Sequence, residues 1–309
     1  MFTQLFTHPA CLEHDTGEGH PECADRLRAI LQALEHERFL HLERHEAPLG
    51  DVDMIKKVHK PEYVDAILNK VPEKGHAFVD PDTLLSPGSK EAMLRSVGGV
   101  CSAIDAVLTG QAPNAFVATR PPGHHAEHSA AMGFCFFNNA AVGARYAQET
   151  FRLRKIAVVD FDVHHGNGTE ELFRFDPDLF YASSHQFPAY PGTGHQEDRG
   201  QFNNICNAEL PPGADGKAFR HAYEHEILPA LDHFKPELII ISAGFDAHGR
   251  DPLAQCRLST DDFIWVTREI KKIAAEHCRG RIVSVLEGGY DLGALAASVA
   301  VHVAVLMEH

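Results

Sequence analysis

The chain has 309 residues, of which 44% are hydrophobic and 23% are charged, the composition of an ordinary globular protein. The formal net charge of −15 repels phosphate backbones, so we expect no direct binding to nucleic acid. A net negative charge suits a cationic substrate, although it can also serve solubility alone. The longest nearly apolar stretch, Ala294–Met307, is interrupted by His302 and is too short to span a membrane.

The seven cysteines are scattered and form no C-x-x-C pair, so a disulfide framework is not expected. The first residues lack the basic and apolar regions of a secretion signal. We therefore expect a cytoplasmic protein. No repeat, low-complexity tract or linker-like segment interrupts the sequence, and we interpret residues 1–309 as a single domain.

Short apolar runs rich in Val and Ile alternate along the chain with segments of helical periodicity. Such runs, without polar alternation, are typical of buried parallel strands. The alternation predicts an α/β layered fold with a mainly parallel sheet. The predicted strands are Ala115–Ala118, Ile156–Val159, Leu179–Ala182, Leu238–Ile241 and Ile282–Leu286, and the predicted helices are Ala140–Phe151, Phe219–Phe234, Asp261–His277 and the C-terminal Ala294–Met307.

Polar motifs follow four of these strands in turn: TRPPGHH, DFDVHHGNG, SAGFD and EGGYD. In open α/β sheets, ligands bind beyond the carboxyl ends of the strands. The four motifs are therefore expected to meet in one crevice.

The second and third motifs suggest a metal centre. Asp160, Asp162 and His164 are spaced two apart, and on an extended segment such residues face the same way. Carboxylate and imidazole groups suit zinc, and three protein ligands with one open position are typical of catalytic zinc. We expect the ligands to be Asp162, His164 and Asp246, with Asp160 orienting a nearby histidine. Alternatively, the motif is a charged strand end that caps the next helix.

Two further motifs suggest proton transfer and oxyanion stabilisation. The adjacent His124 and His125 follow a turn stiffened by prolines, and imidazoles that titrate near neutral pH suit acid–base catalysis. Tyr290 follows two glycines, and its hydroxyl can donate a hydrogen bond to a developing oxyanion. Taken alone, the histidine pair could be a surface feature and the tyrosine a core residue.

Together the segments HPECADR, RPPGHHA, GFCFFNN, VDFDVHHGNGT, SAGFDAHGRDPL and LEGGY resemble the histone deacetylase superfamily, in particular its class II-type branch and the bacterial histone-deacetylase-like amidohydrolases. The matching segments run in the family's order from Glu13 to Tyr290. This resemblance implies an arginase-like α/β/α domain with a parallel sheet of about eight strands. It also implies a zinc-dependent hydrolase that removes an acyl group, such as acetyl, from the side-chain amine of lysine.

The resemblance assigns roles residue by residue. The zinc ligands are Asp162, His164 and Asp246; the catalytic histidines are His124 and His125, partnered by Asp160 and Asn167; and Tyr290 polarises the carbonyl. Asp is common in other branches where this chain has Asn167. Substrate-binding positions are Gly133 at the tunnel floor, Phe134 and Tyr190 as its walls, Leu253 at its mouth, and Arg26 as an internal arginine linked to acetate exit. Thr83 or a neighbour is a candidate at the rim.

Family members also bind potassium, partly through main-chain oxygens. By analogy, one K⁺ site would use Asp160, Asp162, His164, Ser183 and Ser184, and a second would use Phe173, Asp176, Leu179 and Asn204. Such ligands leave no side-chain signature in the sequence, so both sites depend on the resemblance alone.

The sequence is compatible with several alternatives. An acetylated polyamine could replace acyl-lysine as substrate, but polyamine-specific relatives often carry a gatekeeper Glu where this chain has Leu253. A binder that recognises acyl-lysine without cleaving it would be expected to have lost a site residue. An arginase-like ureohydrolase would need more acidic ligands for two manganese ions. Hydroxamate-type inhibitors are expected to bind, and a homo-oligomer is expected by analogy with bacterial relatives.

Overall fold

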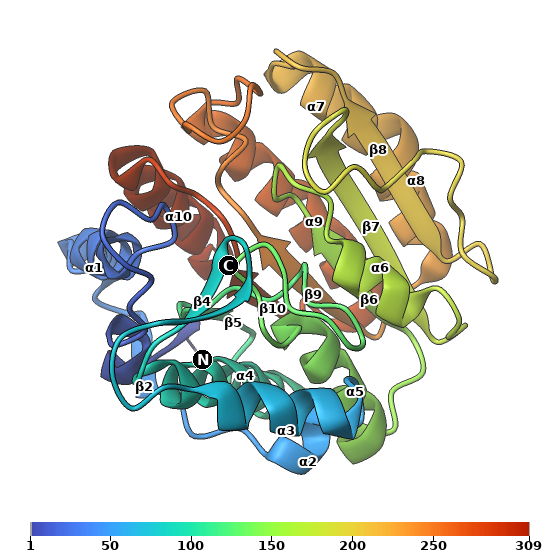
Figure 1. The fold of residues 1–309 in the computed structure, drawn as a ribbon. Helices are drawn as coiled ribbons and strands as arrows, with labels where there is room; N and C mark the ends of the chain where they lie inside the picture. The colour runs from blue at the N-terminus through green and yellow to red at the C-terminus, as the bar shows by residue number, and fades with distance from the viewer. Residues whose placement is uncertain (1, 309) are drawn as a thin grey trace.

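The computed structural model describes residues 2–308. An eight-stranded sheet, with the strand order β2-β1-β5-β10-β9-β6-β7-β8, crosses the molecule (Figure 1). Every neighbouring pair in this sheet is parallel. The strands are β1 Gln4–Thr7, β2 Glu43–Glu46, β5 Asn114–Val117, β6 Ile156–Asp160, β7 Leu179–Gln186, β8 Ile205–Leu210, β9 Leu238–Ala243 and β10 Ile282–Leu286. The predicted α/β class and parallel sheet are thus confirmed.

Helices cover both faces of the sheet (Figure 1). One face carries α1 Ala24–Ala33, α7 Gly216–Ala222, α8 Leu228–Phe234, α9 Thr260–Cys278 and α10 Leu292–Met307. The other carries α2 Val52–Ile55, α3 Pro61–Lys70, α4 Ser89–Leu108 and α5 Asn139–Phe151, with α6 Asn167–Phe173 beside the sheet. Within residues 2–308, no helix has the length and apolar character needed to cross a membrane.

Side-chain alternation along the strands divides the interior into two cores. In β6, Ala157 and Val159 join the α9–α10 side, whereas Ile156 and Val158 join the α4–α5 side. Successive residues of a strand point to opposite faces, so a strand buried on both faces needs an unbroken apolar run. This is why the short Val- and Ile-rich runs could be recognised as strands.

Three sheet strands have no counterpart among the predicted ones: β1, β2 and β8. The edge strand β2 has the sequence ERHE, and all four residues are exposed, so it carries no apolar signal. The predicted helix Phe219–Phe234 is also interrupted: a π-helical turn at Tyr223–Ile227 separates α7 from α8. Pro229 lies at the start of α8, directly after this turn, and has no N–H to donate to the preceding turn.

Three helices end with a basic residue in the left-handed conformation: α5 at Arg152, α8 at Lys235 and α9 at Arg279. A left-handed residue after the last helical turn reverses the chain. Each turn leads within four residues to the first residue of β6, β9 or β10. The amino ends of these strands therefore receive the returning chain, and their carboxyl ends carry the polar motifs.

Outside the sheet, β3 Ala77–Asp80 and β4 Thr83–Leu85 form an antiparallel hairpin. Two short 3-10 helices, Pro9–Leu12 and Glu37–Phe39, complete the elements of the described chain. All seven cysteines are free thiols, as the absence of paired cysteine motifs predicted.

Candidate active site

Four neighbouring strands of the sheet deliver the polar motifs to one place. The loop after β5 carries His124 and His125, the loop after β6 carries Asp162 and His164, and Asp246 and Tyr290 follow β9 and β10. Because these strands are adjacent and parallel, their carboxyl ends lie at one edge of the sheet. The expected meeting of the four motifs is therefore observed.

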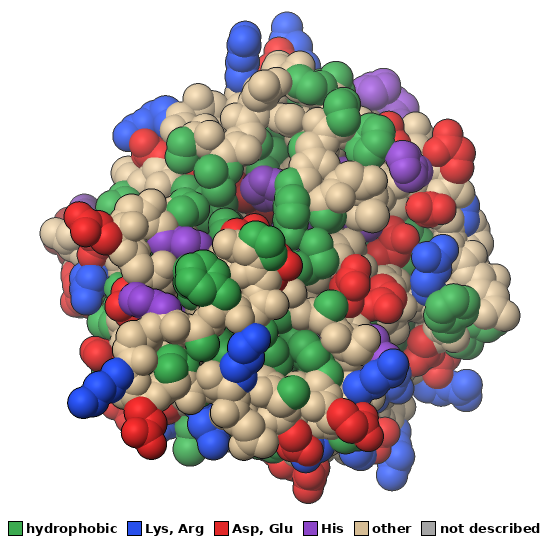
Figure 2. Space-filling view, viewed as in Figure 1, with side chains coloured by type: hydrophobic (Ala, Val, Ile, Leu, Met, Phe, Trp, Pro, Cys, Tyr) green, Lys and Arg blue, Asp and Glu red, His purple; other side chains and the backbone are tan. Residues whose placement is uncertain are grey.

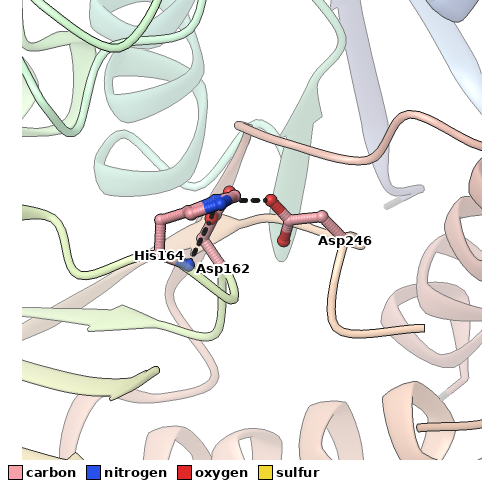
Figure 3. Close-up of side chains that lie close together, drawn as sticks. All are labelled: Asp162, His164 and Asp246. Atoms are coloured by element: carbon pink, nitrogen blue, oxygen red, sulfur yellow. Dashed lines mark hydrogen bonds and ion pairs between the residues drawn. The ribbon is translucent and has the colours of Figure 1, made fainter. Parts of the chain in front are cut away.

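Asp162, His164 and Asp246 form a compact group of buried donor atoms (Figure 3). One ligand atom from each residue lies within 4.8 Å of the others. The His164 ring nitrogen Nδ1 is 3.1 Å from Asp162 Oδ1 and 3.0 Å from Asp246 Oδ2. Burial raises the pKa of Asp246 to about 7, with the neighbouring charge of Asp162 adding to the effect.

The spacing of Asp160, Asp162 and His164 predicts an extended segment, but the structure shows that the strand does not continue through these residues. The strand β6 ends at Asp160, whose Oδ1 accepts the main-chain N–H of Asp162 at 3.0 Å. Asp162 Oδ1 likewise accepts the N–H of His164 at 2.9 Å. Such contacts two residues apart curl the chain, and this curl, not strand alternation, places Asp162 and His164 together.

The donor set fits a divalent cation such as zinc. A single nitrogen, His164 Nδ1, faces two carboxylate oxygens, and one proton cannot fully satisfy both, whereas a cation can bind all three atoms. The remaining carboxylate oxygens are held by the main chain: Asp246 Oδ1 accepts the N–H of Val163, and Asp162 Oδ2 accepts that of Gly288. A Cβ at Gly288 would collide with both carboxylates, so glycine permits this close approach.

The two adjacent histidines have different partners. His124 Nδ1 is 2.9 Å from Asp160 Oδ2, and Tyr181 donates to the same oxygen at 3.0 Å. Although burial lowers the pKa of His124, the charges of Asp160 and Asp162 outweigh it and raise the pKa to about 10. His124 is therefore held as a cation.

His125 contacts a neutral amide instead of a carboxylate. Its Nδ1 is 2.8 Å from Asn167 Oδ1. The orientation of this amide is fixed, because Asn167 Nδ2 donates to Glu127 Oε1 at 2.7 Å. The amide oxygen can only accept, so His125 donates through Nδ1 and keeps Nε2 free as an acceptor. Burial and the neighbouring cationic His124 hold the pKa of His125 well below its usual value.

A pocket of about 200 Å³ opens above these residues. It is lined by Asp82, His125, Gly133, Phe134, His164, Tyr190, Leu253 and Tyr290. A Cβ at Gly133 would clash with the His125 ring, so the glycine leaves room at that point. Near the centre of the face in Figure 2, histidine and acidic side chains show between apolar ones.

Tyr290 lies on the pocket wall above a buried arginine. The guanidinium carbon of Arg26 is 4.9 Å from the centre of its ring, and Arg26 also donates to the carbonyl oxygens of Gly289 and Glu287. Burial raises the pKa of Tyr290 well above its usual value, although the charge of Arg26 acts in the opposite direction. The phenol therefore keeps its proton at neutral pH and can donate it in a hydrogen bond.

Three side chains that the sequence did not single out support the site. Glu287 Oε2 accepts the main-chain N–H groups of Gly123 and His124 at 2.8 and 3.2 Å. Asp251 Oδ2 accepts that of Tyr290 at 2.7 Å. Asp82 places its side chain in the pocket lining next to Thr83, the residue named as a rim candidate. An acidic residue at a strand end is a weak signal, since its partners are distant in sequence.

The residues of the predicted potassium sites are partly brought together. Ser183 and Ser184 lie in β7, beside β6, but Ser183 Oγ contacts His185 Nδ1 at 2.9 Å and Ser184 Oγ donates to Tyr223. The carbonyl oxygens of Phe173, Asp176 and Leu179 converge on the side chain of Asn204.

A family model described as the histone deacetylase domain matches residues 20–306. This chain belongs to the histone deacetylase family. The match spans all of the pocket-lining residues, and membership makes the chain a hydrolase of the deacetylase type.

Named relatives of this histone deacetylase family member come from bacteria, archaea and plants. A histone deacetylase-like amidohydrolase of Pseudomonas aeruginosa is 39% identical, covering 88% of this chain and 72% of its own. A probable deacetylase of Archaeoglobus fulgidus is 37% identical, covering 96% and 83%. The crystal structure of the HDA15 HD domain superposes with a TM-score of 0.92 at 33% identity, over 99% of this chain and 88% of that one.

Proposed function

We propose that this histone deacetylase family member is a zinc-dependent deacylase that hydrolyses the amide of acyl-lysine in a protein or peptide. The observation that carries this proposal is the convergence of three buried metal-type donors with His125 and Tyr290 at one pocket. A zinc ion held by Asp162, His164 and Asp246 would polarise the substrate carbonyl and acidify a water molecule. Hydrolysis of an amide needs in addition a base, an acid and an oxyanion donor.

His125 has the properties of the base. Its Nδ1 proton is engaged by Asn167, so its Nε2 lone pair is available toward the pocket to accept a proton from water. The same nitrogen can then deliver this proton to the departing amine. His124, kept cationic by Asp160, supplies positive charge beside the reacting atoms.

Tyr290 is suited to stabilise the substrate oxygen as its negative charge develops. Its hydroxyl remains protonated, and its main chain is fixed through Asp251. A preorganised donor of this kind contributes about 3–4 kcal/mol to transition-state stabilisation. Arg26, beneath the ring, holds the turn through two carbonyls; its predicted part in acetate exit remains a proposal.

The pocket suits a slender apolar stem. Phe134 and Tyr190 supply aromatic surface, and Leu253 adds an apolar side chain, 41% exposed, at the mouth. The methylene stem of lysine can lie along such surfaces while its amide reaches the buried end. An acyl-lysine side chain therefore suits the pocket in both polarity and shape.

One residue of the pocket is compatible with the polyamine alternative. Asp82 lines the pocket, and its carboxylate could attract a distal ammonium group. It could equally accept a main-chain N–H of a peptide substrate. The presence of Leu253 in place of an acidic gatekeeper keeps acyl-lysine as the preferred proposal.

The test is turnover by the purified, zinc-loaded protein of a fluorogenic acetyl-lysine peptide, with N-acetylputrescine and N8-acetylspermidine in parallel. We expect peptide turnover that is lost in His125→Ala and blocked by a hydroxamate. Turnover of the polyamines alone would establish the alternative. Binding without turnover of any of the three would favour a non-catalytic binder, and two metal ions per chain would favour an arginase-like enzyme.

We also propose a location, a cation site and an assembly state for this chain. The seven free cysteines support a reducing, cytoplasmic location. The first potassium site and a homo-oligomer are proposed from the family resemblance, and metal analysis and light scattering test them. A single domain over residues 1–309 is proposed because no linker-like segment interrupts the sequence.

A further inference from the structure

Three main-chain carbonyl oxygens point at one side-chain nitrogen near the carboxyl end of α6. Asn204 Nδ2 is 2.9 Å from the oxygen of Phe173, 3.1 Å from that of Asp176 and 2.9 Å from that of Leu179. Asn204 is 3% exposed. We call these three oxygens the carbonyl cage.

The orientation of the Asn204 amide follows from its surroundings. Its Oδ1 accepts the main-chain N–H of Phe202 at 3.3 Å, whereas the three cage atoms can only accept. The nitrogen therefore faces the cage. Gly200 lies against the amide oxygen, where a Cβ would approach to 2.5 Å, so the backbone on that side is also shaped around this side chain.

The cage has the chemistry of a site for a hard monovalent cation. Main-chain carbonyls are the ligands by which proteins replace the hydration shell of potassium. The last carbonyls of a helix also carry partial negative charge, and Phe173 is the last residue of α6. The second predicted potassium site uses these same residues, yet the point at which the oxygens converge is filled by the amide nitrogen.

We propose that the Asn204 amide takes the place of a cation in the carbonyl cage, and that this chain binds no potassium there. Its two N–H groups supply the positive ends of their dipoles to three oxygens, so one proton is shared. The amide also ties the segment after α6 and the start of β7 to the residues that precede β8. This proposal does not depend on the proposed catalytic function.

A thermal unfolding experiment on the full chain tests the proposal. Wild type, Asn204→Ala and Asn114→Ala are compared in potassium and in tetramethylammonium chloride at equal ionic strength. Asn114 is a matched control, because it is buried and donates to a single carbonyl, that of Leu306 at 2.9 Å. The change in Tm that potassium causes in wild type is subtracted from that of each variant, which removes any effect of a cation bound elsewhere.

In tetramethylammonium, Asn204→Ala is expected to lower Tm by roughly 4–8 °C, from the loss of two or three hydrogen bonds. Potassium should restore at least half of this loss in Asn204→Ala and none of the loss in Asn114→Ala. If potassium does not act selectively on Asn204→Ala, the carbonyls do not form a cation cage and the proposal is overturned.

Crystals of wild type and of Asn204→Ala soaked in thallium(I), a potassium analogue with an anomalous signal, provide a second test. We expect no anomalous peak between the carbonyl oxygens of Phe173, Asp176 and Leu179 in wild type, and a peak there in Asn204→Ala. A peak in wild type, with the Asn204 side chain turned away, would show that the cage holds a cation. Neither readout requires substrate, so failure of the proposed activity would leave this test unaffected.

Discussion

Asp251 and Tyr290, 39 residues apart in the chain, are joined by a hydrogen bond of 2.7 Å from the tyrosine main-chain N–H to a carboxylate oxygen. The other oxygen of Asp251 accepts the N–H of Leu253 at 3.0 Å. One carboxylate thus fixes both the phenol and the apolar residue at the pocket mouth. Each is placed relative to the other through this single side chain.

Removing this carboxylate is expected to lower kcat without a comparable rise in KM. Asp251→Ala should lower kcat by about 10²-fold, because a small displacement of Tyr290 misaligns its hydroxyl. Asp251→Asn retains one acceptor oxygen, so its kcat should lie between that of Asp251→Ala and that of wild type. Steady-state kinetics on the acetyl-lysine peptide measure both; equal losses in the two variants would contradict the positioning role.

The Tyr290 hydroxyl itself can be tested against that of Tyr190. Tyr290→Phe should lower kcat by about 10²–10³-fold while zinc content and hydroxamate affinity change little, because only the oxyanion donor is lost. Tyr190→Phe should keep most of the activity, since its ring, not its hydroxyl, forms the wall. Full activity of Tyr290→Phe with zinc bound would refute the assigned role.

The pH profile should respond to the partner of His125. Asn167→Asp places a negative charge beside the ring and should raise its pKa, which moves the acidic limb of the kcat/KM profile to higher pH. Glu127 lies 2.7 Å from the amide nitrogen of Asn167, so the new carboxylate would be repelled. The double variant with Glu127→Gln removes this repulsion; an unmoved limb in both variants would show that His125 is not the titrating base.

Acid should destabilise the fold through buried neutral histidines, among them His302. Its ring lies 2.7 Å from Thr267 Oγ1 and 2.8 Å from Ser284 Oγ, and burial lowers its pKa to about 3. The unfolded chain, with a pKa near 6.5 for this residue, then binds the proton that the folded chain does not. The contribution to stability is therefore full above pH 6.5 and lost progressively as the pH falls toward 3.

Because of this linkage, replacing His302 should make the free energy of unfolding depend less steeply on pH. In His302→Gln, the free energy of unfolding should fall less steeply with acid, by about 1.2 kcal/mol per pH unit between roughly pH 6 and 5. Urea unfolding at several pH values measures the slope for both proteins. Other buried histidines contribute equally to each, so identical slopes would exclude a contribution from His302.

The parts of the site that could be predicted are those where side-chain chemistry follows a recognisable strand. Asp162, His164 and Asp246 come after apolar runs that are buried on both faces, so their place at one edge of the sheet follows from the pattern. The curl that joins Asp162 to His164 could not be derived in the same way, because it depends on hydrogen bonds from Asp160 and Asp162 to the main chain.

Other features are invisible in sequence for a different reason. The strand β2 is exposed along its whole length, so pairing through main-chain groups alone defines it. Glu287 and Asp251 act on main-chain N–H groups more than 35 residues away, and such partners leave no periodic signal. Asn204 was expected to act through its main chain, whereas its side chain fills the carbonyl cage.

The reversal turns at Arg152, Lys235 and Arg279 lie at the end of the sheet opposite the pocket. The proposed active site lies where β6, β9 and β10 end, while the chain re-enters the sheet where they begin. A dye, an immobilisation tether or an inserted peptide joined at one of these turns would thus be separated from the pocket by the length of a strand. Such attachment points would let substrate capture be followed on a surface with the catalytic loops left untouched.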